Sequence, residues 1–147
     1  MTLSEWRRIL STNLDGTFLC TRAVLPHMRA RQYGRIVNLS SDTVLLGLPG
    51  MAAYIAAKAA VIGLTRTLAN EVGGDGITVN ALMPGLIASE TVLRELGPRF
   101  EISVGLQPLK RRGQPEDVAE CVAYLASPAA GFVTGQSIAI NGGQRFN

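Results

Sequence analysis

The stretch Gly34-Arg35-Ile36-Val37-Asn38-Leu39-Ser40-Ser41 decides the fold of this chain. The segment 35–39 is short and contains the β-branched residues Ile36 and Val37, and polar residues follow it at once. This is the pattern of a buried strand with a polar C-terminal end. Residues 52 to about 72 then predict a long helix that Gly73-Gly74-Asp75-Gly76 stops. A buried strand followed by a long helix indicates an α/β fold with a parallel sheet.

The segments on either side continue the alternation. Residues 5 onward predict a helix that Ser4 or Thr2 caps and that Pro26 and then Gly34 end. Further strands are expected at residues 77–81 and 137–140, and a third helix opens at Pro115. Residues 86–109 have no clean period and predict a mobile flap with short helices. We therefore expect one unit over residues 1–147, a partial Rossmann-like fold with about three parallel strands.

Composition narrows the function classes. The 147 residues are 47% hydrophobic and 17% charged, which excludes disordered and collagen-like chains. The net charge is only +3, and the basic residues form no stripe interleaved with aromatic residues, so we expect no nucleic-acid partner. No apolar run is long enough to cross a bilayer and the start is unlike a signal peptide, so we expect a cytoplasmic protein. Cys20 and Cys121 are expected as two buried thiols, and no ligand cluster near His27 indicates a metal.

Three side chains carry the expected chemistry. Tyr54 and Lys58 stand four residues apart on the predicted helix and therefore share one face. A neighbouring ammonium stabilises a phenolate, so such a pair can act as acid or base near neutral pH. Ser41 lies at the C-terminal end of the first predicted strand, where open α/β sheets bind ligands, although a serine there is otherwise a turn former or helix cap.

Four motifs in order give a resemblance to a known family. They are Gly34 to Ser41 as quoted above, Tyr54-Ile55-Ala56-Ala57-Lys58, Ile77-Thr78-Val79-Asn80-Ala81 with Pro84-Gly85, and Thr134-Gly135-Gln136 with Asn141-Gly142-Gly143. Together they resemble the successive signatures of the short-chain dehydrogenase/reductase family, especially members similar to 3-oxoacyl-ACP reductase. The match spans almost the whole chain.

The resemblance implies a role for each matching residue. Tyr54 is the implied general acid/base and Ser41 orients the substrate oxygen, whereas Lys58 assists Tyr54 and binds the nicotinamide ribose. Asn13 matches a helix asparagine that holds a water near Lys58, although an asparagine within a helix otherwise marks a kink or a bond back to the main chain. The resemblance also implies cofactor contacts at four further positions, Pro84, Gly85, Ile87 and Ser89. The expected cofactor is NAD or NADP.

The sequence also departs from the family pattern. It contains no strand followed by a TGxxxGxG turn, and Gly73-Gly74-Asp75-Gly76 stands between a helix and a strand, the reverse of the required order. Three absent units of about 30 residues correspond to about 90 residues. We expect the strand at residues 35–39 to be an unpaired edge, and this chain alone to bind NAD(P) weakly or not at all.

Two functions remain open at this point. The first is an NAD(P)-dependent oxidoreductase that interconverts a carbonyl and an alcohol, with an apolar or amphipathic small-molecule substrate and a homo-oligomeric state implied by the family. The second is a truncated, cofactor-deficient fragment that acts as a non-catalytic oligomerisation or interaction module.

Overall fold

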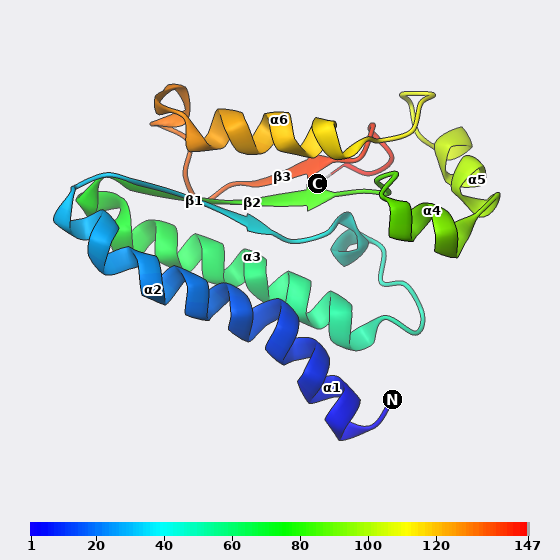
Figure 1. Ribbon diagram of the computed structural model, residues 1–147, viewed down its shortest axis with the longest axis horizontal. Coiled ribbons are helices and arrows are strands. Elements are labelled where there is room, and N and C mark those ends of the chain that lie inside the picture. The colour runs from blue at the N-terminus through cyan, green and yellow to red at the C-terminus, as the bar shows by residue number, and fades with distance from the viewer. Residues whose placement is uncertain (147) are drawn as a thin grey trace.

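The computed structural model describes residues 1–146 as a three-stranded parallel sheet between two layers of helices (Figure 1). The strands are β1 (Gly34–Leu39), β2 (Ile77–Pro84) and β3 (Ser137–Ile140), in the order β1-β2-β3. The α-helices are α1 (Leu3–Leu10), α2 (Gly16–Ala30), α3 (Ala52–Val72), α4 (Glu90–Leu96), α5 (Arg99–Leu106) and α6 (Pro115–Ala126). The expected Rossmann-like α/β class with three parallel strands is therefore confirmed.

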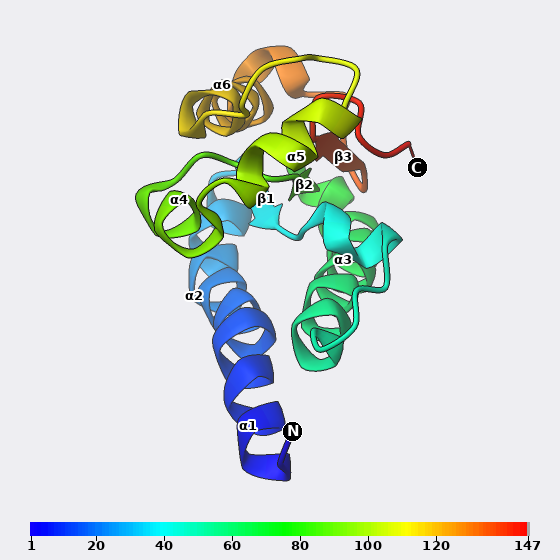
Figure 2. The same ribbon diagram turned by 90° about the vertical axis from the view of Figure 1, so that its right-hand side faces the viewer.

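Helices α2 and α3 cover one face of the sheet and α6 covers the other (Figures 1 and 2). Parallel strands with helices on both faces need apolar residues throughout, and nearly all of β2 is buried. Helix α3 packs on β2 through small residues at four-residue steps, which form one helix face: Ala53, Ala57, Val61, Thr65 and Ala69. On the other face of the sheet, Leu82 and Leu125 are buried in an apolar cluster between the sheet and α6.

Helix α3 is the one helix in residues 1–146 that is long and apolar enough to span a bilayer by composition alone. Its buried face lies on β2, as described above, and its polar residues Arg66, Asn70 and Glu71 are exposed. It is the core helix of an α/β layer.

The first helical region differs from the expectation of one helix ended by Pro26. Thr2 caps α1 in a capping box with Glu5, and α1 continues through a π-helical turn, Ser11–Asp15, into α2. Pro26 lies inside α2, which ends only at Ala30. A proline removes one N–H and can be tolerated at an exposed position near a helix end, where little packing opposes the local adjustment.

The other elements lie close to their predicted ranges. Helix α3 has the predicted bounds, whereas β2 continues to Pro84, three residues beyond the expected strand. The expected flap contains α4 and α5, as the sequence suggested. Gly76, with φ +70°, makes the left-handed turn from α3 into β2, and a Cβ there would lie 2.4 Å from the Gln32 carbonyl oxygen.

Strand β1 is an edge of the sheet, as expected. Its outer side opens onto a shallow groove between β1 and α2, and Leu39 is 49% exposed. Cys20 lines this groove and is exposed, so the prediction that it is buried was wrong. Within α2 only Thr21 is fully buried, because the sheet does not extend beneath the rest of that helix face. Cys121, within α6, is half-buried and packs against the cluster that contains Leu82 and Leu125.

Candidate active site

The candidate active site lies where β1 ends and α3 begins. Ser40 and Ser41 follow β1 directly, while Tyr54 and Lys58 occupy the first two turns of α3. The Ser40 hydroxyl donates a hydrogen bond of 2.8 Å to the main-chain oxygen of Lys58. This bond joins the serine turn to α3 at the level of Lys58, so the structure brings these sequence-predicted residues into one neighbourhood.

The Ser41 hydroxyl is arranged as a hydrogen-bond donor. Its Oγ caps a short 3₁₀ turn, Asp42–Leu45, by accepting hydrogen bonds from the Thr43 amide at 3.3 Å and from the Thr43 hydroxyl at 2.9 Å. A serine hydroxyl has two acceptor lone pairs and one proton. Since both bonds use the lone pairs, the proton is free to be given to an oxygen of a bound molecule. The cap alternative and the functional role are thus compatible in one side chain.

Tyr54 and Lys58 share one face of α3. The Lys58 Nζ lies 5.6 Å from the centre of the Tyr54 ring, and within residues 1–146 the Tyr54 hydroxyl has no hydrogen-bond partner. Burial lowers the pKa of Lys58, because desolvation disfavours the ammonium. Its Nζ donates a hydrogen bond of 2.9 Å to the Leu39 main-chain oxygen. The lysine is thus directed to the end of β1.

Asn13 lies in the π-helical turn between α1 and α2, which packs against α3. Its side-chain amide donates to the Ile9 main-chain oxygen at 3.0 Å, and the Thr17 hydroxyl donates to the Asn13 main-chain oxygen at 3.1 Å. The structure therefore shows the kink and the bond back to the main chain that an asparagine within a helix can form.

The four remaining candidate positions follow β2. Gly85 donates its amide to the Ile140 oxygen at 2.9 Å, and Ile87 forms a parallel bridge with Gly113. The Ser89 hydroxyl caps α4 by accepting from the Val92 amide at 3.4 Å. The structure thus aligns the segment from Pro84 to Ser89 along the C-terminal ends of β2 and β3.

Several polar residues of the motifs hold the fold together. Asn38 donates to the Thr65 hydroxyl at 2.9 Å, which joins β1 to α3. Asn80 donates to the Val133 oxygen at 2.8 Å and accepts from the Gln136 amide at 3.1 Å, which joins β2 to the loop before β3. Each of these amides is buried and paired, as buried polar groups must be. Among residues 1–146, no group of three or more potential metal ligands is present.

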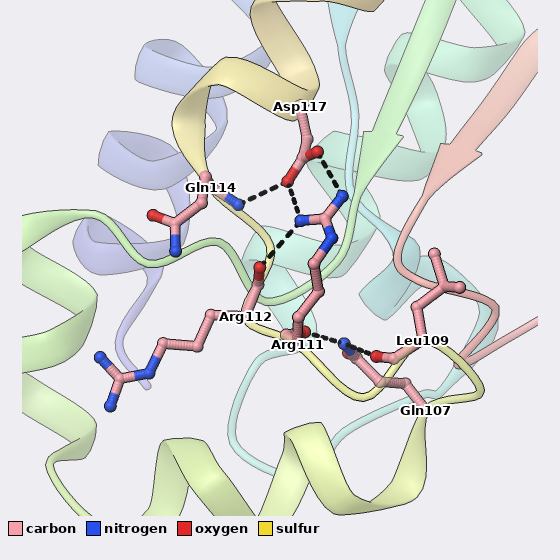
Figure 3. A network of polar contacts seen from close by, with 6 residues as sticks. All are labelled: Gln107, Leu109, Arg111, Arg112, Gln114 and Asp117. Atoms are coloured by element: carbon pink, nitrogen blue, oxygen red, sulfur yellow. Dashed lines mark hydrogen bonds and ion pairs between the residues drawn. The ribbon is translucent and has the colours of Figure 1, made fainter.

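Sequence reasoning missed a polar clamp between α5 and α6, shown in Figure 3. The Arg111 guanidinium binds both carboxylate oxygens of Asp117, at 2.7 and 2.6 Å, and Asp117 also accepts from the Gln114 amide. These hydrogen bonds lower the pKa of Asp117 to about 2, and the bonds from Arg111 contribute more to this shift than the bond from the Gln114 amide. The buried Gln107 amide donates to the Leu109 and Arg111 oxygens.

The clamp borders a cavity of about 220 Å³. Leu86, Ile87 and Ile140 form part of its wall, whereas Ser41, Tyr54 and Lys58 do not line it. The sequence signal for the clamp was the acidic first turn of the Pro115 helix, where Asp117 also completes a capping box with Gln114.

A parallel α/β sheet with helices on both faces and candidate polar residues at the C-terminal ends of its strands defines the class of Rossmann-like folds, which bind ligands at that edge. A family model described as "Enoyl-(Acyl carrier protein) reductase" matches residues 1–145. The chain belongs to the short-chain dehydrogenase/reductase family.

Individual relatives agree with this membership. The chain is 44% identical over 144 residues to a 3-oxoacyl-[acyl-carrier-protein] reductase of Synechocystis sp., covering 97% of this chain and 57% of the relative. It is 45% identical over 150 residues to an acetoacetyl-CoA reductase of Rhizobium meliloti, covering 99% and 61%. The structure matches a 3-oxoacyl-[acyl-carrier protein] reductase with bound NAD from Brucella melitensis, with a TM-score of 0.86, 40% identity and coverages of 97% and 53%.

The chain thus spans a little over half the length of these relatives. The matched part contains the tyrosine helix and the C-terminal strands, which is consistent with a partial domain.

Proposed function

We propose that this chain carries the catalytic half of an NAD(P)-dependent oxidoreductase that interconverts a carbonyl and an alcohol. The observation that carries the proposal is the Ser41 hydroxyl, whose lone pairs are occupied by Thr43 and whose proton is free. Tyr54 presents a second unpaired hydroxyl on the adjacent helix α3. Two such hydroxyls at one strand end suit a substrate oxygen that gains or loses a proton.

The residues present fit the nicotinamide end of the cofactor better than its phosphates. The amine of Lys58 is half-buried at the end of β1, where it can bind ribose hydroxyls, and the main chain of Pro84, Gly85 and Ile87 follows the neighbouring strand end. Ser89 caps α4, so its hydroxyl reaches a phosphate only if that cap is shared or broken. NAD or NADP supplies or accepts the hydride when bound.

The chain's own residues handle the oxygen and its proton. In the reducing direction, Ser41 donates a hydrogen bond to the carbonyl oxygen and Tyr54 gives it a proton as general acid. In the oxidising direction, Tyr54 removes the hydroxyl proton as general base. Lys58, placed one helical turn from Tyr54, stabilises negative charge on the phenolic oxygen. Asn13 acts in this scheme as a support of the helix layer beside α3 and as the candidate holder of a water near Lys58.

The substrate in this proposal is a small carbonyl or alcohol compound of apolar or amphipathic character. Leu45, in the turn that Ser41 caps, and Leu48, in the loop that follows, are exposed and can contact such a molecule. Phe100 belongs to the core and not to this lining, because it is only 1% exposed and the Arg112 guanidinium lies over its ring. The names of the relatives suggest 3-oxoacyl thioesters as the first compounds to test.

The deciding experiment measures oxidation of NADPH and NADH by acetoacetyl-CoA at 340 nm. The purified chain is assayed alone and together with the part of the Synechocystis relative that lies outside the matched segment. We expect turnover only in the mixture, with loss of at least 10²-fold on Tyr54→Phe because the proton donor is removed. Unchanged turnover in Tyr54→Phe would refute the proposal; Thr67→Ser, at an exposed position of α3, is the matched control.

A second candidate function has its own observation. The open edge of β1 and the groove beside α2 offer unpaired main-chain groups and apolar side chains, as an interaction module requires. In this alternative the chain is a non-catalytic partner in a homo-oligomer or in an assembly with full-length relatives. Stable co-purification with such a relative, without any NADPH oxidation in the mixture above, would favour it. We propose a cytoplasmic location in either case.

A further inference from the structure

One buried carboxylate lies at the meeting point of all three strand ends. Asp42 follows Ser41 directly and is only 5% exposed. Its Oδ2 accepts from the Asn141 side-chain amide at 3.4 Å, in the turn that follows β3. A Cβ placed on Gly85, after β2, would lie 3.0 Å from the same oxygen. The carboxylate therefore touches the segments that follow β1, β2 and β3.

Asn141 organises its own turn around this contact. It is 8% exposed, its Oδ1 accepts from the Gly143 amide at 3.1 Å, and its Nδ2 also donates to the Arg145 oxygen at 3.1 Å. Gly85 is packed against the Asn141 Cβ, where no side chain on residue 85 would fit. A movement of Asn141 would therefore displace Gly85. Asp42 lies against both residues, because its Oδ2 accepts from Asn141 and lies close to Gly85.

We propose that Asp42 is a positioning residue, which links the Ser41 turn to Gly85 through Asn141 and so fixes the substrate-oxygen side of the site relative to the nicotinamide side. The proposal rests on the proposed function only in the roles given to Ser41 and Gly85. The link itself is a property of the folded chain without cofactor. Its physical basis is that a buried acceptor must be paired, so Asp42 and Asn141 hold each other in place.

The charge of Asp42 gives the link a pH dependence. Burial raises the pKa of Asp42, and the hydrogen bond from Asn141 and the positive charge of Arg145 oppose that rise. Arg145 is the charged side chain that faces Asp42 from the segment after β3, and the contacts from the segment after β2 come from an uncharged glycine. A second carboxylate at position 141 would oppose ionisation of Asp42 further, because like charges at this separation cannot both be ionised cheaply.

Amide hydrogen exchange reports the link directly. The Thr43 amide donates to Ser41 Oγ and the Gly85 amide donates to the Ile140 oxygen, so their exchange rates follow the two sides of the site. We expect Asp42→Ala to raise both rates by roughly fivefold to tenfold, the effect of one lost hydrogen bond. Asp42→Asn keeps an acceptor for Asn141 and should restore rates near those of the unchanged chain. Glu116→Gln, which removes an exposed carboxylate from α6, is the control.

A second pair of variants covers the case in which Asp42→Ala does not fold. Asn141→Asp faces one carboxylate with another and should be most destabilised at neutral pH, with recovery as the pH falls. Combining it with Asp42→Asn restores an amide–carboxylate pair, with the amide now at position 42 and the carboxylate at position 141. This double variant should lose most of that pH dependence. Unchanged exchange in Asp42→Ala, equal exchange in Asp42→Asn and Asp42→Ala, or no rescue in the double variant would each overturn the link. Intact coupling in a chain that never supports turnover would count against the proposed function alone.

Discussion

Replacing Thr65 by valine tests how strongly the sheet holds the helix that bears Tyr54. Thr65 is 0% exposed and its hydroxyl is the only hydrogen-bond partner of the buried Asn38 amide, at 2.9 Å, among residues 1–146. Valine has nearly the same shape, so the change leaves no large cavity, but it strands the amide. The cost of a buried unsatisfied donor is about 1–3 kcal/mol. For a chain of this length, each 1 kcal/mol shifts Tm by about 2–4 °C.

Urea denaturation followed by circular dichroism measures this loss, and a double-mutant cycle identifies its cause. Asn38→Leu removes the stranded amide, so the double variant with Thr65→Val should regain most of the lost free energy of unfolding. We expect it within about 1 kcal/mol of the unchanged chain, because an apolar pair of similar shape can replace a hydrogen-bonded one. A neutral Thr65→Val variant, or strictly additive losses in the double variant, would refute the reasoning. Thr67→Val, on the exposed side of α3, is the matched control.

Three further outcomes are expected. Leu125→Ala should lower the free energy of unfolding by about 2–5 kcal/mol in urea denaturation, because Leu125 is fully buried between α6 and the sheet, and a loss below 1 kcal/mol would contradict that packing. Asp117→Asn should be less stable than the unchanged chain at pH 6 but not at pH 2, which urea denaturation at a series of pH values measures. The pKa of Asp117 in the folded chain is lowered to about 2. The ionised carboxylate therefore stabilises the fold above the pKa of the unfolded chain, and this stabilisation is lost as the pH falls through the folded pKa. One equivalent of a maleimide should label Cys20 before Cys121 in a peptide map, because Cys20 is exposed whereas burial raises the pKa of the Cys121 thiol, and equal labelling would contradict the open groove.

Local sequence signals predicted where helices begin and end at positions where a glycine or a proline restricts the backbone conformation. The glycines after Val72 end α3 at the predicted residue, and Pro115 opens α6 as expected. Pro26 misled the prediction, since its effect on α2 depends on the packing around that turn rather than on its identity alone. The π-helical turn around Asn13 was foreseen only as a possible kink, because an inserted residue leaves little trace in helical periodicity.

The site residues could be chosen from the sequence, whereas their partners could not. The four-residue spacing of Tyr54 and Lys58 fixes a shared helix face, and it gives no information on the Leu39 carbonyl that Lys58 contacts. Arg111 and Asp117 are six residues apart across the end of a loop, a spacing with no regular geometry. Contacts of this kind depend on how loops return to the strand ends, and that is decided by tertiary packing.

The Lys58 contact connects the chemistry to the open edge of the sheet. The Ser40 amide donates to the Leu82 oxygen of β2 at 2.8 Å. In a trans peptide the carbonyl of the preceding residue points the opposite way, so the Leu39 oxygen faces the side of β1 that no strand covers. Lys58 donates to that oxygen, and a strand added alongside β1 would compete for it. Covering the edge would therefore favour release of the lysine amine toward Tyr54 and a bound ribose. On this reasoning, a strand paired with β1 would free Lys58 for the role that the proposed function gives it.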